Sequence, residues 1–124
     1  MPHAAITGWG TSVPDRVLTN HDLETMVDTT DEWIVSRTGI RERRIVGERD
    51  TTTSLATAAA RQALERAQLS ADELDLIVVG TATPDDFLVA QAAMVQAEIG
   101  GNAGAFDVGA ACAGFVTALS VGTQ

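Results

Sequence analysis

The sequence predicts an α/β fold in which buried strands alternate with helices. Two short runs, LIVVGT (76–81) and AGAFDV (103–108), are largely apolar at successive positions, which is typical of strands covered on both faces in a parallel sheet. A long alanine-rich segment precedes the first run, and an apolar helix-like segment follows the second. With 45% apolar residues among 124, we expect one domain spanning residues 1–124.

The first elements are short. AITGWG (5–10) is largely apolar and ends in glycine, which favours a strand. VLTNHDLETMV (17–27) has the features of a helix start, because Thr19 or Asn20 can cap the helix and acidic residues follow in the first turn.

A second short helix is expected within DTTDEWIVSRTG (28–39). Thr30 is the expected N-cap, acidic residues suit the positive end of the helix, and Gly39 supplies the C-terminal stop. Trp33 and Arg37 are four residues apart, so both side chains project from one face of this helix.

The remaining elements follow in alternation. SLATAAARQALERAQL (54–69) is rich in good helix formers, and SADE (70–73) has the capping-box pattern that begins a further turn. TPDD (83–86) marks a loop after the first buried strand. VAQAAMVQAEIGG (89–101) predicts a helix that ends at one of its two glycines.

Composition excludes several classes of protein. The formal net charge of −9 speaks against nucleic acid as a partner. A single cysteine forbids an internal disulfide, and its spacing to His3 and His21 suits no zinc site, so we expect no metal. The N-terminus lacks the features of a signal peptide, and the apolar stretch 103–122 contains Asp107 and several glycines without basic anchors. We therefore expect no membrane span and a cytoplasmic protein.

The lone cysteine, Cys112, stands where the second buried strand ends and the apolar segment CAGFVTALSV (112–121) begins. Helix N-terminal N–H groups favour a thiolate and can stabilise an oxyanion beside it, and the small residues at 109–114 let a substrate approach closely. The alternative is an unreactive cysteine that merely fills the core. The helix is apolar nearly all round, which predicts that it is buried.

The basic residues are unevenly distributed. All eight are arginines, and five of them lie between Arg37 and Arg49. Such a cluster in an acidic chain can hold a phosphorylated ligand. The alternative is a solvated face on which Glu42 and Glu48 pair with the arginines, and the pattern leaves both interpretations open.

Several stretches together resemble the β-ketoacyl-acyl-carrier-protein synthase III family, the condensing enzymes that initiate fatty-acid synthesis in bacteria and plastids. They are VDTTDEWIVSRTGIRERRI (27–45), LIVVGTATPD (76–85) and AFDVGAACAGFVTALSVG (105–122), and TNHDLE (19–24) also fits. The resemblance covers nearly the whole chain. It implies the N-terminal half of a layered, thiolase-like α/β fold.

The resemblance also implies roles for individual residues. Cys112 matches the nucleophile that accepts an acyl group from acyl-coenzyme A as a thioester. Trp33 matches a residue that stacks on the adenine, Arg37 one that contacts adenine and phosphate, and Thr29 a neighbouring contact to the same nucleotide. Coenzyme A then enters as a thioester substrate, and no cofactor is expected. From the residues alone, Trp33 can instead be a core or interface anchor, and Arg37 can pair with a carboxylate of its own helix.

The loop after TPD departs from the family pattern. It reads DFLVAQ (86–91), whereas the family usually has an aromatic or apolar pair followed by Pro-Ser. In the family this loop reaches across the dimer and helps to shape the acyl pocket, so Phe87 and Leu88 are the candidates for lining it. The difference leaves the acyl-chain preference open.

The family's catalytic set is Cys–His–Asn, and no histidine or asparagine of this sequence stands in a matching motif. We therefore expect a C-terminal half bearing His and Asn, on a separate chain or removed by cleavage or truncation, and no condensing activity from residues 1–124 alone. The resemblance further implies a homodimer and malonyl-acyl-carrier protein as the second substrate. Two other hypotheses stay open: a condensing enzyme of secondary metabolism, and a non-catalytic dimerisation module.

Overall fold

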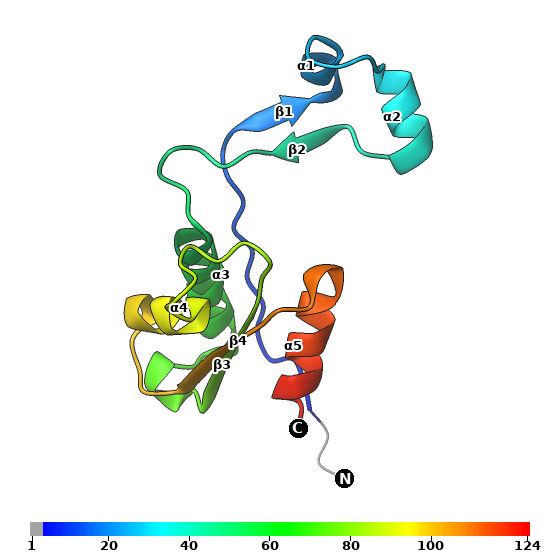
Figure 1. The fold of residues 1–124 in the computed structure, drawn as a ribbon. Helices are drawn as coiled ribbons and strands as arrows, with labels where there is room; N and C mark the ends of the chain where they lie inside the picture. The colour runs from blue at the N-terminus through cyan, green and yellow to red at the C-terminus, as the bar shows by residue number, and fades with distance from the viewer. Residues whose placement is uncertain (1–3) are drawn as a thin grey trace. The chain divides into compact units, whose positions relative to one another are not determined.

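The computed structural model describes residues 4–124, which form two compact units (Figure 1). The first unit holds the N-terminal segment up to Ser12 together with Thr51–Gln124, and the second holds Val13–Asp50. No helix in the described range is long and apolar enough to cross a bilayer.

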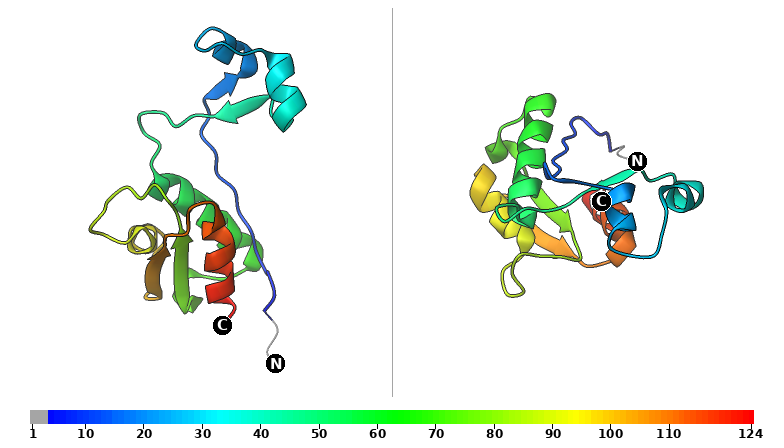
Figure 2. Two further views of the ribbon diagram at one scale, coloured as in Figure 1. Left: turned by 45° about the vertical axis from the view of Figure 1, so that its right-hand side comes forward. Right: turned by 90° about the horizontal axis from the view of Figure 1, so that it is seen from above.

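The first unit is a layered α/β arrangement, as predicted. Its elements are α3 (Thr52–Ala67), the 3₁₀ turn η1 (Ala71–Glu73), β3 (Leu76–Gly80), α4 (Gln91–Ile99), β4 (Gly104–Val108), the 3₁₀ turn η2 (Ala111–Ala113) and α5 (Gly114–Gly122). The strands β3 and β4 pair in parallel, with Val78 opposite Phe106. Helix α4 packs against both strands and against α3, whereas α5 packs on β3 from the other side (Figure 1 and Figure 2).

Local signals set the ends of these helices. The Thr51 hydroxyl accepts a hydrogen bond from the Ser54 N–H, so α3 begins two residues before the predicted start. At η1, the Glu73 carboxylate accepts from the N–H of Ser70 at 2.8 Å, which confirms the predicted capping box. Helix α4 ends at Gly100, which has a φ of 90°, a conformation that favours glycine.

The predicted strand at 5–10 is wrong, because these residues form no strand in the structure. The segment lies against α3 instead: the Gln62 side-chain amide donates to the Thr11 carbonyl at 2.8 Å. A Cβ at Gly10 would stand 1.9 Å from the Ala59 carbonyl oxygen, so the backbone can approach the helix only with glycine there. The glycines of the segment lie close to a helix rather than beside a second strand, and its large apolar side chains are exposed, Ile6 by 75% and Trp9 by 62%.

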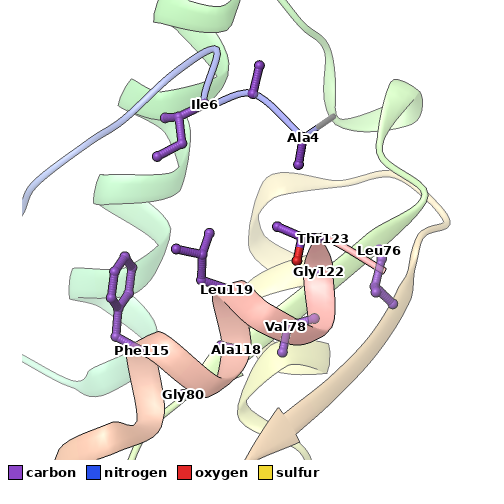
Figure 3. Close-up of a pocket in the computed structure, with 11 residues that line it drawn as sticks. Ala4, Ile6, Leu76, Val78, Gly80, Phe115, Ala118, Leu119, Gly122 and Thr123 are labelled. Atoms are coloured by element: carbon purple, nitrogen blue, oxygen red, sulfur yellow. The ribbon is translucent and has the colours of Figure 1, made fainter. Parts of the chain in front are cut away.

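Helix α5 is more exposed than the sequence predicts. Phe115 is 74% exposed and Val116 is 63% exposed, although the helix is apolar nearly all round. One side of α5 and the strand β3 border an apolar hollow of about 610 Å³, where Ile6, Val78 and Leu119 lie (Figure 3). Periodicity predicts that an apolar helix has neighbours on all sides, and residues 4–124 supply them on one side of it.

The second unit is built on a pair of very short strands. Its elements are β1 (Val17–Thr19), α1 (Asn20–Glu24), α2 (Asp31–Thr38) and β2 (Glu42–Arg44). The two strands pair antiparallel, with Leu18 opposite Arg43. The sequence predicts neither strand, because three residues are too few to display an alternation of apolar and polar side chains.

Candidate functional site

Cys112 lies in the turn that joins β4 to α5, as predicted. It is the middle residue of η2 and is exposed, and α5 itself begins at Gly114. The N–H groups of Ala113 and Gly114 donate to the carbonyls of Ala110 and Ala111, which closes the turn locally. The thiol is therefore accessible and stands at the N-terminal end of a nine-residue helix, where developing negative charge is favoured.

The backbone around Cys112 carries two features that the sequence did not reveal. Ala111 has a φ of 43°, a left-handed conformation that costs a non-glycine residue about 1–2 kcal/mol. A Cβ at Gly80 would stand 2.6 Å from the carbonyl oxygen of Gly114, so the end of β3 and the start of α5 touch. The left-handed backbone at Ala111 and the close contact between Gly80 and Gly114 together define the turn on which Cys112 lies.

Trp33 and Arg37 lie together on α2, as their spacing predicts. The Thr30 hydroxyl accepts from the N–H of Trp33 at 3.1 Å, and Gly39 closes the helix with a φ of 72°, which confirms both predicted caps. The guanidinium carbon of Arg37 lies over the Trp33 ring, 5.9 Å from its centroid. Trp33 is 58% exposed, so it is no core residue of this unit.

A hollow of about 270 Å³ adjoins this pair. It is lined by Asp28, Thr29, Thr30 and Trp33. The second unit thus brings Thr29 and Trp33 to one hollow and places the Arg37 cation over the indole. An aromatic face beside a guanidinium and a hydroxyl suits a base that carries phosphates.

The carboxylate pairing considered for the arginines is not found. Within residues 4–124 the ion pair is that of His21 with Glu24, and neither the acidic residues of α2 nor Glu42 and Glu48 pair with an arginine. Arg43 instead donates to the Asn20 side-chain oxygen at 2.8 Å. Arg44 donates to the Pro14 carbonyl at 3.1 Å. These two arginines of the cluster brace the second unit.

Phe87 and Leu88 form the tip of the loop between β3 and α4. Each is 96% exposed. The Asp86 carboxylate shapes the tip, because it accepts from the N–H groups of Leu88 at 2.6 Å and Val89 at 3.1 Å. That the two apolar side chains line an acyl pocket stays a prediction.

The base of this loop is held by Asp85, which sequence reasoning missed. Its carboxylate accepts from the N–H groups of Thr52 and Thr53, at 2.8 and 2.7 Å, in the first turn of α3. It also accepts from the Thr53 hydroxyl. The backbone N–H of Asp85 donates to the side-chain oxygen of Gln91, which is fully buried. The loop is thereby fastened to two helices.

Asp107 fastens β4 to the start of α4 in the same manner. Its carboxylate accepts from the N–H groups of Gln91 at 2.6 Å and Ala92 at 2.8 Å. The N-cap residue of α4 is Ala90, which has no side-chain acceptor. The Asp107 carboxylate of the neighbouring strand therefore accepts hydrogen bonds from the first N–H groups of α4 in place of an N-cap side chain. The available signal was an acidic residue within an apolar strand, five positions before Cys112.

The Asp85 bonds predict a pH dependence of stability. The Thr53 hydroxyl, together with the Thr53 and Thr52 N–H groups, lowers the pKa of Asp85 from 3.8 to about 2. The folded state therefore favours the ionised carboxylate, and this stabilisation is present above pH 3.8 and is lost as the pH falls through about 2. Asp85→Asn should lower the free energy of unfolding at neutral pH. Chemical denaturation should find the difference from the parent shrinking through that pH window, and a difference that stays constant would contradict the assignment.

Comparison with known proteins shows which family the chain resembles. A β-ketoacyl-[acyl-carrier-protein] synthase III of Roseiflexus castenholzii is 57% identical over 122 residues, which are 98% of this chain and 37% of the relative. The chain corresponds to the N-terminal part of the proteins that make up the β-ketoacyl-[acyl-carrier-protein] synthase III family. It spans a little over a third of the length of such relatives. No model of a protein family matches it.

Two solved structures share the fold of this chain. The crystal structure of the 3-oxoacyl-[acyl-carrier-protein] synthase III of Aquifex aeolicus matches with a TM-score of 0.91 and 51% identity, over 94% of this chain and 38% of that one. The priming β-ketosynthase of the R1128 polyketide biosynthetic pathway matches with a TM-score of 0.89 and 41% identity, over 95% of this chain and 36% of that one. The thiolase-like α/β fold predicted from the sequence is confirmed for this N-terminal part.

Proposed function

We propose that the protein to which residues 1–124 belong is a β-ketoacyl-acyl-carrier-protein synthase III that acts in the cytoplasm and uses Cys112 as its nucleophile. The observation that carries the proposal is the exposed thiol on the strand-to-helix turn, in a chain 57% identical to a named synthase III. The exposed Trp33 and Arg37 support a nucleotide-bearing acyl donor.

In the first stage the Cys112 sulfur attacks the carbonyl carbon of acyl-coenzyme A. The carbonyl oxygen gains negative charge, and N–H groups in the first turn of α5, other than the Gly114 N–H that closes the preceding turn, are suited to stabilise it. The bond to the coenzyme A sulfur then breaks, coenzyme A leaves as its thiol, and the acyl group remains on Cys112 as a thioester. Trp33, Arg37 and Thr29 hold the nucleotide of the donor.

In the second stage malonyl-acyl-carrier protein loses carbon dioxide, and the resulting carbanion attacks the thioester carbonyl. The Cys112 thiolate departs and the β-ketoacyl product stays on the carrier protein. By family resemblance, the His and Asn that stabilise the enolate belong to a C-terminal half. The apolar side of α5 and β3 is suited to pack against that half, and the complete protein is expected to be a homodimer.

A condensing enzyme of secondary metabolism is the second candidate. The observations that favour it are the DFLVAQ loop and the 41% identity to a priming ketosynthase of a polyketide pathway. Both candidates use the same first stage, and they differ in the acyl groups accepted. Turnover with a panel of acyl-coenzyme A donors and malonyl acceptors separates them, because a fatty-acid initiator should prefer a short donor with malonyl-acyl-carrier protein.

The proposed nucleotide platform, which consists of Trp33, Arg37 and Thr29, predicts a selective effect of Trp33→Ala in the complete protein. Loss of a stacking ring costs about 1–3 kcal/mol, which corresponds to a rise of roughly 5-fold to 150-fold in KM for acyl-coenzyme A. With acyl-pantetheine, a donor that lacks the adenine nucleotide, Trp33→Ala should react as fast as the parent protein does with that donor. Steady-state kinetics with both donors provide the measurement. Trp9→Ala, which removes the other tryptophan, is the matched control, and equal losses with the two donors would rule out the platform.

A further inference from the structure

The motif TNHDLE (19–24) contains a buried residue for which the proposed reaction gives no role. Asn20 is 1% exposed and begins α1, but the cap of that helix is made by Thr19 and Asp22. A buried side-chain amide must find partners, since an unpaired donor or acceptor in the interior destabilises the folded state. The partners of Asn20 therefore show what it holds.

The amide of Asn20 reaches both ends of α2. Its Nδ2 donates to the Asp31 carboxylate at 2.7 Å and to the Ile40 carbonyl at 2.8 Å. Asp31 is the first residue of α2, and Ile40 follows Gly39, the residue that ends the helix. One side chain thus fixes where this eight-residue helix begins and where the chain leaves it.

Neighbouring groups complete the attachment. Arg43 of β2 donates to the Asn20 Oδ1 at 2.8 Å, so both donors and the acceptor of the amide are occupied. The Glu24 carboxylate accepts from the backbone N–H of Asp31 at 2.6 Å. Helix α2 is therefore held through polar contacts from α1 and β2, together with its buried Ile34.

We propose that Asn20 is a positioning residue that sets the orientation of α2 and, through it, the binding of the donor's nucleotide by Trp33 and Arg37. The inference rests on the proposed function for those two residues. It assigns the TNHDLE motif to recognition of the acyl donor rather than to the chemistry at Cys112. Asn20 itself touches no substrate in this account.

The test is Asn20→Asp in the complete protein. The substitution keeps the size of the side chain, but a carboxylate cannot donate to Asp31 or to the Ile40 carbonyl. We expect KM for acyl-coenzyme A to rise about 10-fold, in line with the loss of buried hydrogen bonds, with kcat nearly unchanged. The rate with acyl-pantetheine should not change, whereas general damage to the fold would lower the rates with both donors.

Two further variants sharpen the test. Asn102→Asp makes the same substitution at an exposed position, and it should leave KM for acyl-coenzyme A and the rate with acyl-pantetheine unchanged. The exchanged pair N20D/D31N restores a donor opposite an acceptor and should recover part of the lost affinity. A parent-like KM in Asn20→Asp overturns the inference. If Trp33→Ala still discriminates between the donors in that case, the proposed nucleotide platform stands; if it does not, the proposed function of α2 fails as well.

Discussion

Cys112→Ala in the complete protein is expected to abolish acyl transfer from acyl-coenzyme A. Removal of a nucleophile that forms a covalent intermediate typically lowers kcat by roughly 10³-fold or more. Substrate binding should persist, because Trp33, Arg37 and Thr29 lie on a different unit from the cysteine. Release of coenzyme A thiol measures the rate, and equilibrium titration with a non-hydrolysable acyl-coenzyme A analogue measures the binding.

Two controls show whether the loss is chemical. Ser120→Ala removes a γ oxygen from α5 without touching the turn, and it should retain the parent rate. Cys112→Ser keeps the shape of the side chain but replaces the thiol by a far weaker nucleophile, so it should resemble Cys112→Ala. An alanine variant that still transfers acyl groups at a comparable rate would place the nucleophile elsewhere.

The largest effect on stability is expected at Gln91. Its side chain is fully buried, accepts from the Asp85 N–H at 2.8 Å and donates to the Thr53 hydroxyl at 2.6 Å. Gln91→Leu keeps the bulk but leaves the Asp85 N–H without its acceptor. We expect the free energy of unfolding to fall by roughly 2–3 kcal/mol, because two hydrogen bonds worth about 1 kcal/mol each are lost and the loop is no longer fastened to α4 through this side chain.

The matched control for this effect is Gln96→Leu on the same helix. Gln96 makes one side-chain bond, to the Ala103 carbonyl at 2.6 Å, and its loss should cost about 1 kcal/mol. Urea denaturation of the complete protein measures both variants. If Gln91→Leu were no more destabilising than Gln96→Leu, the network around Asp85 would not carry the stability assigned to it.

Features encoded within a few residues could be predicted from the sequence. Thr30 and Gly39 bound α2 because a cap needs only its own helix turn, and the spacing of Trp33 and Arg37 fixes their common face. The parallel pairing of β3 and β4 followed from two apolar runs separated by a helix. The position of Cys112 between β4 and α5 followed from the same alternation.

Features that depend on distant partners could not be predicted. The segment 5–10 has the composition of a strand, but its neighbour in the structure is α3, which no local pattern reveals. Asp107 serves a helix that starts 16 positions earlier, and Asn20 reaches Ile40 across 20 positions. Polar residues of this kind are ambiguous in a sequence, because the same side chains are common on solvated surfaces.

The central claim is that the Cys112 sulfur carries the acyl group. The most direct measurement incubates the complete protein with an isotopically labelled acyl-coenzyme A, digests it, and locates the label by peptide mass spectrometry. The account predicts the acyl mass on the peptide that contains Cys112, removable by hydroxylamine as a thioester is. Label on another residue, or an unlabelled Cys112 in a preparation that turns over its substrates, would contradict it.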